Sequence, residues 1–440
     1  MSVSLVRLIT LHEVKHMEIS RIRIGGFRNI SEMNVSFDEV TALVGLNGYG
    51  KSNVIDAIDF GFDFIQYSNT RKESLMMAKN CIPLLTANVG KDYLFEIESK
   101  VSDGATTYYV LYSFSFSWKT AHAEAGIKSE LLKIKKEGKN QKYNTYISRS
   151  SDSAYYRTSE TGRCDRKIKI ESNALIINKL LALDDLYYLP IVEQINANHF
   201  YIERHLDASS SFDPDPFVIK GFKELELQGI QSIPRAIYYL KKDYPEKYKL
   251  LVNAFKLLFP NVIDLKVREI KLNQSAKVEV SDDAPFVFTD SIYLISITDK
   301  RLHQPIRFEQ LSNGTKRVFL TLTVAIIADI KNLSMIAIEE PENSIHPRLF
   351  QSYIDIITQL VDGCKIIFTS HSPYIIQYLN PQSIYVGISN ATGEVNFKKI
   401  ATTKVHSLLT DAAKYDSSVG DYIFTLISSE TDDSILEYCE

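Results

Sequence analysis

The spacing of apolar residues changes along the chain, and these changes predict where strands and helices lie. Apolar and polar residues alternate over residues 19–27, as in a strand with one buried face. A short apolar run, Val40–Val44, predicts a buried strand, and the apolar spacing from Lys51 onward predicts a helix. The segment between them, Gly45–Gly50, is rich in glycine. The N-terminal part therefore predicts the order strand, glycine loop, helix.

The middle of the chain separates into a region of strands and a region of helices. Residues 92–118 are rich in aromatic and β-branched residues with turn formers between them, which predicts antiparallel strands. Residues 130–166 are polar and basic and predict an exposed hairpin region. From about 172 to 262 the apolar spacing becomes helical, without the sustained heptads of a long coiled coil.

Two further apolar strands are predicted in the C-terminal part, and both end in polar residues. Met335–Ile338 leads into Glu339 and Glu340, and Lys365–Thr369 leads toward His371. In α/β proteins, ligands collect where the carboxyl ends of the strands meet. The whole pattern predicts an α/β fold with its functional residues at one edge of a sheet.

Composition limits the class of protein. With 440 residues, of which 45% are hydrophobic, the chain can bury a large core and should form two structural units. No apolar run approaches the roughly 20 residues that span a bilayer, and the first residues lack a secretory signal, so we expect a cytoplasmic protein without a membrane partner. The first 16 residues precede a second methionine, so either Met1 or Met17 is the native start.

Cysteine spacing and charge exclude some sites and leave the partner open. The four cysteines are scattered without a C-x-x-C pair, which indicates neither a zinc site nor a disulfide framework and fits a reducing cytosol. The formal net charge of -4 gives no global attraction to nucleic acid, so contact with DNA would need a local basic surface.

The glycine segment carries the strongest chemical signal. Gly45–Ser52 reads GLNGYGKS, which matches the phosphate-loop pattern G-x-x-x-x-G-K-[ST] between a strand and a helix. Its backbone N–H groups and the helix N-terminus would face the phosphates of ATP. We expect Lys51 to reach the β and γ phosphates and Ser52 to ligate Mg²⁺; a chance glycine turn is the alternative. The expected nucleotide-binding residues of this loop are Gly45, Asn47, Gly48, Gly50, Lys51, Ser52 and Asn53.

Asn47 and Asn53 keep a second interpretation. Asparagine is common in turns and caps, so these two side chains fit a structural role as well as they fit a nucleotide role.

The two C-terminal strand ends supply the other half of the predicted site. Adjacent carboxylates at the end of a buried strand are costly unless they are paired or face a metal. We expect Glu339 to join the Mg²⁺ shell and Glu340 to orient and polarise the attacking water. His371 is expected to donate to the γ phosphate or to hold the water. The alternatives are a solvated acidic loop and a structural histidine.

A second helix N-terminus is predicted far along the chain. Leu311–Arg317 reads LSNGTKR and precedes a long apolar helix, Val318–Ile330. Ser312, Asn313 and Gly314 would leave N–H groups free for an anion, unless they form an ordinary cap. Since one helix N-terminus already serves the phosphate loop, this one is expected to contact ATP bound by another copy. That predicts a head-to-tail homodimer, with larger assemblies open.

These segments together resemble an ABC-type ATPase head. GLNGYGKS, LSNGTKR, AIEEPE with NSIHP, and FTSH are similar to its Walker A, signature, Walker B, D-loop and H-loop elements. The opening IRIGGFRNI, with Arg28 on its F-R-N element, and EEPENSIHP are similar to the RecF/OLD-like (AAA_15/AAA_21) group, whose members act on DNA. The resemblance covers about residues 17–120 and 260–385.

The resemblance implies a P-loop fold and a division of the chain. The fold would be a mixed sheet with an antiparallel β lobe, plus a helical insertion. Residues 1–150 would hold Walker A and the β lobe, residues 151–262 the mainly helical insertion, and residues 263–440 the signature, Walker B and H-loop.

Two departures from the family pattern bear on turnover. The signature reads Asn313, Gly314, Thr315 where transporter heads have GGQ, and Glu339 replaces the more usual aspartate. The extra methylene of Glu339 would shift the Mg²⁺ contact, so we expect slow hydrolysis with ATP acting mainly as a structural switch. No glutamine of the Q-loop type stands out, since Gln66 is too weak a candidate.

The resemblance also suggests a function. Single heads of this size look like the ATPase subunits of anti-phage systems, such as PtuA of Septu or AriA of PARIS, which work with a separately encoded nuclease of HNH or TOPRIM type. Only 69 residues follow His371 (440 minus 371) and no HNH-like histidine cluster is present, so this chain is not expected to cut DNA itself.

Two other functions remain as alternatives. A RecF-like DNA-repair ATPase would draw on the lysine-rich stretch Lys133–Lys142, although charged hairpins are usually only solvated. A transporter head is disfavoured by the EEPE run followed by His346 and Pro347, and by the predicted insertions.

Overall fold

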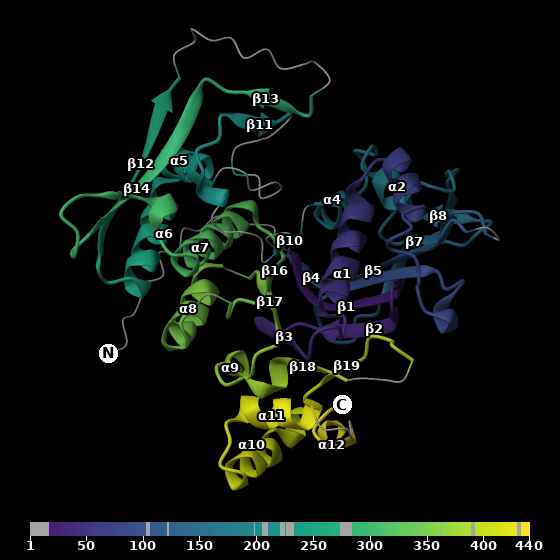
Figure 1. The fold of residues 1–440 in the computed structure, drawn as a ribbon. Coiled ribbons are helices and arrows are strands. Elements are labelled where there is room, and N and C mark those ends of the chain that lie inside the picture. The colour runs from purple at the N-terminus through teal and green to yellow at the C-terminus, as the bar shows by residue number, and fades with distance from the viewer. Residues whose placement is uncertain are drawn as a thin grey trace.

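The computed structural model describes residues 17–102, 106–120, 123–197, 199–204, 210–220, 225, 233–272, 284–343, 345–361, 363–388, 392–428 and 433–440. The question of Met1 or Met17 as the start therefore concerns residues outside the described ones. The chain forms an α/β structure with two large sheets, as predicted from the sequence (Figure 1).

A six-stranded core sheet carries the strand that precedes the phosphate loop. Its order is β10 (Phe200–Glu203), β16 (Met335–Glu339), β17 (Lys365–Ser370), β3 (Val40–Val44), β18 (Ile384–Gly387) and β19 (Phe397–Lys399). The first five strands are parallel, and β19 runs antiparallel to β18. The three central strands are short, apolar and buried, because helices or the second sheet cover both faces.

The second sheet is antiparallel and forms the β lobe. Its eight strands, in order, are β2 (Ile30–Ser36), β1 (Met17–Phe27), β4 (Tyr93–Ser102), β5 (Thr107–Ser117), β6 (Gly126–Lys136), β7 (Asn144–Arg149), β8 (Ala154–Tyr156) and β9 (Arg166–Lys167). Alternate residues of β4 are buried, as expected for a sheet with one covered face. The aromatic residues predicted to form antiparallel strands over 92–118 lie in β4 and β5.

Helix α1 (Lys51–Gln66) lies between the two sheets. Phe60 of this helix packs against Tyr93 of β4 and Phe116 of β5, and Phe64 packs against Phe116, with ring centroids 4.8 to 6.1 Å apart. Gly61 allows a close approach, because a Cβ there would lie 2.2 Å from the ring of Phe95. The helix that follows the phosphate loop is therefore held firmly along its length.

The opposite face of the core sheet is covered by α7 (Asn313–Lys331) and α8 (Pro347–Leu360). The strands divide their side chains between the two layers: Ile336 and Ile338 pack toward α7 and α8, whereas Met335 and Ala337 pack toward α1. This division explains why the central strands read as continuous apolar runs.

The remaining helices and strands surround this centre. A helical and β lobe contains α5 (Ile233–Asp243), α6 (Pro245–Leu258), β11 (Phe217–Ile219), β12 (Val262–Lys271), β13 (Phe286–Phe288), β14 (Ser291–Asp299) and β15 (Ile306–Arg307). Shorter helices are α2 (Asn69–Met76), α3 (Ile176–Leu180), α4 (Leu189–Asn196), α9 (Pro373–Ile376), α10 (Val405–Lys414), α11 (Val419–Ser428) and α12 (Asp433–Leu436). Single 3₁₀ turns are η1 (Thr86–Asn88), η2 (Ser210–Phe212), η3 (Phe308–Gln310), η4 (Pro381–Ser383) and η5 (Thr402–Lys404).

Two local predictions need correction. The helices expected between about 172 and 262 are present, but that segment also supplies β10 to the core sheet. The region 130–166 was expected to be exposed, yet Glu130 is only 1% exposed. Its carboxylate accepts hydrogen bonds from Ile176 N and Ile177 N, 2.6 and 2.9 Å away, so the buried charge caps α3.

Candidate functional site

The strand register brings the predicted site residues to one edge of the core sheet. Val44 lies opposite Ser370, and Glu339 lies opposite Thr369. Gly45 N donates to Ser370 O at 3.2 Å, directly past the end of β3. The phosphate loop, the carboxylate pair and His371 therefore emerge from three adjacent parallel strands.

The phosphate loop has the backbone shape that its glycines permit. Gly48 and Gly50 adopt left-handed φ angles of 85° and 86°, which side chains other than glycine rarely allow. Gly50 is the N-cap of α1 and makes no side-chain capping bond, so the first N–H groups of the helix have no competing partner from the cap. A Cβ at Gly50 would lie 2.3 Å from Val395, which packs against the loop.

Lys51 is nearly enclosed at the centre of the loop. Its side chain is 8% exposed, and Nζ donates to Gly45 O at 2.8 Å and Leu46 O at 3.0 Å. Burial lowers the pKa of this amine, while the neighbouring carboxylates Glu340, Glu342 and Glu339 act in the opposite direction. A cation is thus held among three carboxylates at the sheet edge.

Glu340 and His371 form a hydrogen-bonded pair. His371 Nδ1 lies 3.0 Å from Glu340 Oε1, and Asn343 Nδ2 donates to the other carboxylate oxygen at 2.5 Å. The backbone of Glu340 has a φ of 47°, an uncommon conformation for a residue other than glycine. Glu340 N donates to Thr369 O at 2.9 Å, which helps to hold that conformation.

Glu339 and Ser52 provide oxygen atoms suited to a cation. Glu339 Oε1 is buried and has no hydrogen-bond partner among the described residues, which is costly for a carboxylate unless another group pairs with it. Ser52 lies exposed in the first turn of α1. Within the described ranges no group of three or more His, Cys, Asp or Glu side chains could hold a metal; Mg²⁺ at a nucleotide site usually needs fewer protein ligands, because phosphates and water supply the rest.

The two asparagines of the loop are placed differently. Asn47 is exposed, with Gly48 beside it. Asn53 is held by the protein: its Oδ1 accepts from Arg28 at 2.8 Å, and its Nδ2 donates to Asn29 Oδ1 at 2.7 Å. The Asn53 side chain therefore connects the first turn of α1 to the turn between β1 and β2.

The predicted signature segment forms the N-terminus of α7. Ser312 is the N-cap, and its hydroxyl accepts from Thr315 N at 3.3 Å. Ser312 and Asn313 are exposed, and Gly314 is partly exposed. The Ser312 hydroxyl also lies 2.9 Å from Thr315 Oγ1, so both of these contacts stay within the first turn of the helix.

Two residues beside the site, Arg28 and Glu342, were not among the predicted site residues, although Arg28 was noted on the F-R-N element. Arg28 has a φ of 46° and forms a 2.5 Å ion pair with Asp56 of α1. Glu342 accepts a hydrogen bond from Ser370 Oγ, and burial raises the pKa of its carboxyl. The only available signals were the F-R-N element for Arg28 and the acidic run for Glu342.

Arg317 and Glu203 form a buried ion pair beside the carboxylates. Each is 2% exposed, and their nearest charged atoms are 3.5 Å apart. Burial raises the pKa of Glu203 to about 7, and the charge of Arg317 acts against this rise. Arg317 was only the last letter of the predicted signature segment, and Glu203 lies on the unpredicted strand β10.

The sequence candidate Gln66 does not belong to the site. It is the last residue of α1, so about 22 Å of helix separates it from Lys51. Gln66 Nε2 donates to Ala197 O at 3.1 Å.

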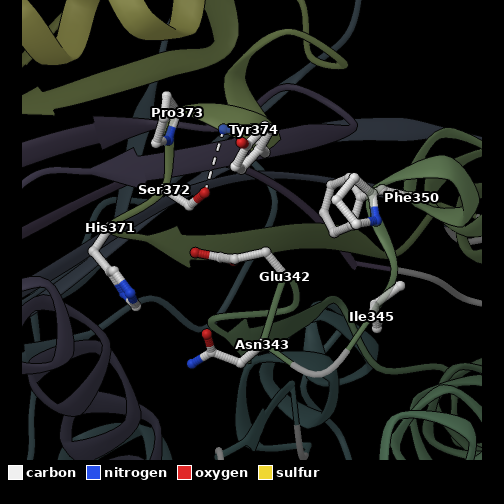
Figure 2. A pocket seen from close by; sticks show the side chains of 9 residues that line it. Glu342, Asn343, Ile345, Phe350, His371, Ser372, Pro373 and Tyr374 are labelled. Carbon is white, nitrogen blue, oxygen red and sulfur yellow. Dashed lines mark hydrogen bonds between the residues drawn. The ribbon is translucent and has the colours of Figure 1, made fainter.

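A cavity of about 380 Å³ lies beside His371 (Figure 2). Glu342, Asn343 and His371 line its polar part, while Phe350 and Tyr374 belong to its apolar part. The turn that carries His371 is held by Ser370, whose hydroxyl accepts from Ser372 N at 2.9 Å. One member of the predicted D-loop, residue 344, lies outside the described residues.

A comparison with protein families identifies a relationship over most of the chain. The AAA_21 family model, described as "AAA domain, putative AbiEii toxin, Type IV TA system", matches residues 40–377. This match includes every predicted site residue and confirms the resemblance to the RecF/OLD-like group. No curated protein matches the sequence.

Comparison with solved structures finds distant likenesses. An SMC head bound to the C-terminal winged-helix domain of ScpA shares 13% identity, with a TM-score of 0.44 over 89% of this chain and 99% of that chain. An SMC head domain from Thermotoga maritima shares 12% identity, with a TM-score of 0.38 over 88% of this chain and 100% of that chain. The recombination mediator RecF shares 12% identity, with a TM-score of 0.40 over 89% of this chain and 100% of that chain.

Proposed function

Because the chain belongs to the AAA-domain family described as "putative AbiEii toxin, Type IV TA system", we propose that it binds and hydrolyses ATP at the edge of its core sheet and that a second copy completes each site. The observation that carries this proposal is the convergence of Lys51, Glu340 and His371 from three distant segments. The amine is enclosed by its own loop and influenced by three carboxylates, and one of these is paired with the histidine.

The phosphate loop would hold the triphosphate. Gly48 and Gly50 let the backbone turn so that N–H groups face the same anion, and the uncapped start of α1 adds its dipole. Lys51 would exchange its contacts with Gly45 O and Leu46 O for phosphate oxygens, which accept charged hydrogen bonds more strongly than carbonyls do.

Ser52 and Glu339 are the residues that would hold Mg²⁺. One offers an exposed hydroxyl in the first turn of α1, and the other offers a buried oxygen without a partner in the described part of the chain. When bound, Mg²⁺ supplies charge neutralisation to the phosphate oxygens. The length of the Glu339 side chain supports slow turnover, with ATP serving mainly to change the assembly.

Glu340 and His371 would act on the attacking water. A carboxylate on Nδ1 makes that nitrogen the donor, so a neutral imidazole presents Nε2 as an acceptor. The pair can then hold a water between Glu340 and Nε2 and draw its proton away, whereas donation from Nε2 to a phosphate would require the imidazolium form. Asn343 holds the remaining oxygen of Glu340 and so fixes the direction of the carboxylate.

The exposed N-terminus of α7 would contact the nucleotide of a second copy. Asn313 and Gly314 present N–H groups at the first turn, and Ser312 adds a hydroxyl beside them. A head-to-tail pair of identical copies would place two such ends against two phosphate loops. ATP would therefore join the two copies, and hydrolysis would release them.

The proposed biological role is that of a sensor or scaffold in anti-phage defence. The family description names a toxin–antitoxin system, which supports an ATPase that works with a separately encoded partner. The partner would be a nuclease of HNH or TOPRIM type, or another toxic effector, held or released as ATP changes the assembly. None of the described helices combines the length and apolar character needed to cross a membrane.

One experiment tests both levels of this proposal. The purified protein is assayed for ATP hydrolysis with and without Mg²⁺, and its mass in solution is measured with and without ATP. The chain is also recovered from its host in both nucleotide states, and co-purifying proteins are identified. Hydrolysis together with ATP-dependent dimers supports the proposed ATPase activity, and an effector nuclease in the eluate supports the defence role. A chain that binds no ATP contradicts the proposed ATPase activity.

A RecF-like DNA-binding ATPase is the second candidate, favoured by three lysines. Lys136, Lys139 and Lys142 are exposed where β6 turns into β7, and none of them forms an ion pair with a described residue. Replacing all three by glutamate should abolish DNA binding if they form the contact, and the affinity of the unmodified protein should fall steeply with salt. Unchanged binding in the triple variant would remove this surface from consideration.

A further inference from the structure

Arg317 connects the signature helix to the catalytic carboxylates within one copy. It is the fifth residue of α7, and its guanidinium is almost completely buried. It donates to Glu339 O and, at 3.2 Å, to Asn343 O, and it forms the ion pair with Glu203. Burying an arginine is costly unless such bonds satisfy it, so the contacts hold it firmly.

The three acceptors belong to separate elements around the site. Glu339 ends β16, Asn343 lies in the turn that follows it, and Glu203 ends the neighbouring strand β10. One side chain therefore ties the first turns of α7 to two strand ends and to the turn between β16 and α8.

These bonds reach Glu340 by two short routes. Arg317 binds the carbonyl of the Glu339–Glu340 peptide, immediately before the left-handed backbone of Glu340. It also binds the carbonyl of Asn343, whose side chain donates to Glu340 Oε2. A shift of α7 would change the direction of the Glu340 carboxylate through both routes.

We propose that Arg317 is a positioning residue that couples the two ATP sites of a dimer. Nucleotide bound by the partner contacts the N-terminus of α7 in one copy. Through Arg317, this contact sets the alignment of Glu340 in that same copy. The inference rests on the proposed function, because it needs α7 to contact the partner's nucleotide. A helix moves as a rigid body, so a shift of α7 also moves Arg317. The hydrogen bonds of Arg317 then shift the residues that hold Glu340. Each site then becomes active only when the other is filled.

Arg317→Lys is the main test. Lysine keeps the charge but cannot bind three acceptors with the fixed fork of arginine. We expect the variant to retain ATP affinity and ATP-dependent dimers, while kcat falls by about 10- to 100-fold because Glu340 is misaligned. The rate of hydrolysis should also lose its cooperative, sigmoidal dependence on ATP concentration and become hyperbolic.

Two further variants keep the test decisive. Glu203→Gln leaves a neutral acceptor for Arg317 and should weaken cooperativity in the same direction, which covers the case in which Arg317→Lys does not fold. Arg235→Lys changes another buried arginine, one that bonds Thr289 and Ser291 away from the site, and should leave cooperativity unchanged.

The outcomes separate the two proposals. Absence of ATP-dependent dimers in the unmodified protein contradicts the proposed function itself. A cooperative unmodified enzyme with Arg317→Lys and Glu203→Gln variants that are slower but equally cooperative would overturn the coupling alone and leave Arg317 a structural residue.

Discussion

The N-termini of α1 and α7 offer the same backbone groups in different surroundings. At α1, a left-handed glycine begins the helix without a side-chain cap, Lys51 is enclosed beside it, and three carboxylates and a histidine lie nearby. At α7, Ser312 caps the helix with its own hydroxyl, and both Ser312 and Asn313 are exposed.

The difference shows that exposed helix N–H groups alone do not make an active site. The end of α1 is surrounded by the chemical groups of its own copy, whereas the end of α7 has only small polar residues and leads, through Arg317, back to Glu340. Under the proposed function, the first end would bind a triphosphate, and the second would contact one that is already bound.

The largest effect should come from removing the cation at α1. Lys51→Ala deletes the buried charge that we propose contacts the phosphates, so ATP binding should weaken by about 100-fold or more, with turnover lost as well. Binding is measured by titration calorimetry. Lys331→Ala, at the exposed far end of α7, serves as the control and should bind ATP normally. Unchanged affinity in Lys51→Ala would show that the loop is not the phosphate site.

Glu340→Gln should separate ATP binding from ATP hydrolysis at the site beside the N-terminus of α1. The amide cannot take a proton from water, so turnover should fall by about 100-fold or more while ATP binding persists. The variant should then accumulate as an ATP-bound dimer, visible by light scattering. Glu246→Gln, on the exposed first turn of α6, is the control. Normal turnover in Glu340→Gln would exclude Glu340 as the group that activates water.

Asn313→Asp tests the other helix end with an almost isosteric change. A carboxylate at the first turn should stabilise α7 by about 0.5 kcal/mol through the helix dipole, yet it should repel a triphosphate. We expect ATP-dependent dimerisation to weaken by about 10-fold while each copy still binds ATP. Asn332→Asp makes the same change at the opposite end of α7 and should not affect dimerisation. Equal dimerisation in both variants would mean that α7 does not meet nucleotide.

The smallest effect on ATP should follow from a change at the far end of α1. Lys72 is fully buried and donates to Ile65 O, Tyr67 O and Asn178 Oδ1, and burial lowers its pKa to about 8. Lys72→Met should reduce the free energy of unfolding by about 1–3 kcal/mol, because those acceptors lose their donor. ATP affinity of the folded protein should stay the same. A large loss of affinity would show that the two ends of α1 are coupled.

Local sequence patterns predicted the central strands and the start of the helix after the glycine loop well. The expected strand Val40–Val44 is β3, the helix begins at Lys51, and the other two strands match β16 and β17 to within a residue. Short apolar runs ending in polar residues are typical of buried parallel strands, so the signal was local. Strand β10 was missed, because four residues in a region of helical spacing give no periodicity of their own.

The site was predictable only where a motif carried it. Lys51, Glu340 and His371 each stand at the end of a predicted strand or loop, and parallel strands bring such ends together. The ion pair between Arg317 and Glu203 joins residues that are 114 positions apart, and no local pattern specifies such a pairing. Asn53 shows the same limit. The sequence fitted a structural role and a nucleotide role equally well, and only its contacts with Arg28 and Asn29 show that its side chain is held by the protein.

The phosphate loop also depends on chain that lies beyond the family match. Strand β18 pairs with β3 through Val386 and Val44, and Val395 packs on Gly50 while its N–H donates to Asn29 O. A truncated protein that stopped near residue 377, where the match ends, would keep every recognisable motif but would lose these neighbours of the loop. The structural unit around the phosphate loop therefore extends beyond the recognisable motifs. Removing the segment after residue 377 should impair nucleotide binding, although that segment is far from the loop in sequence.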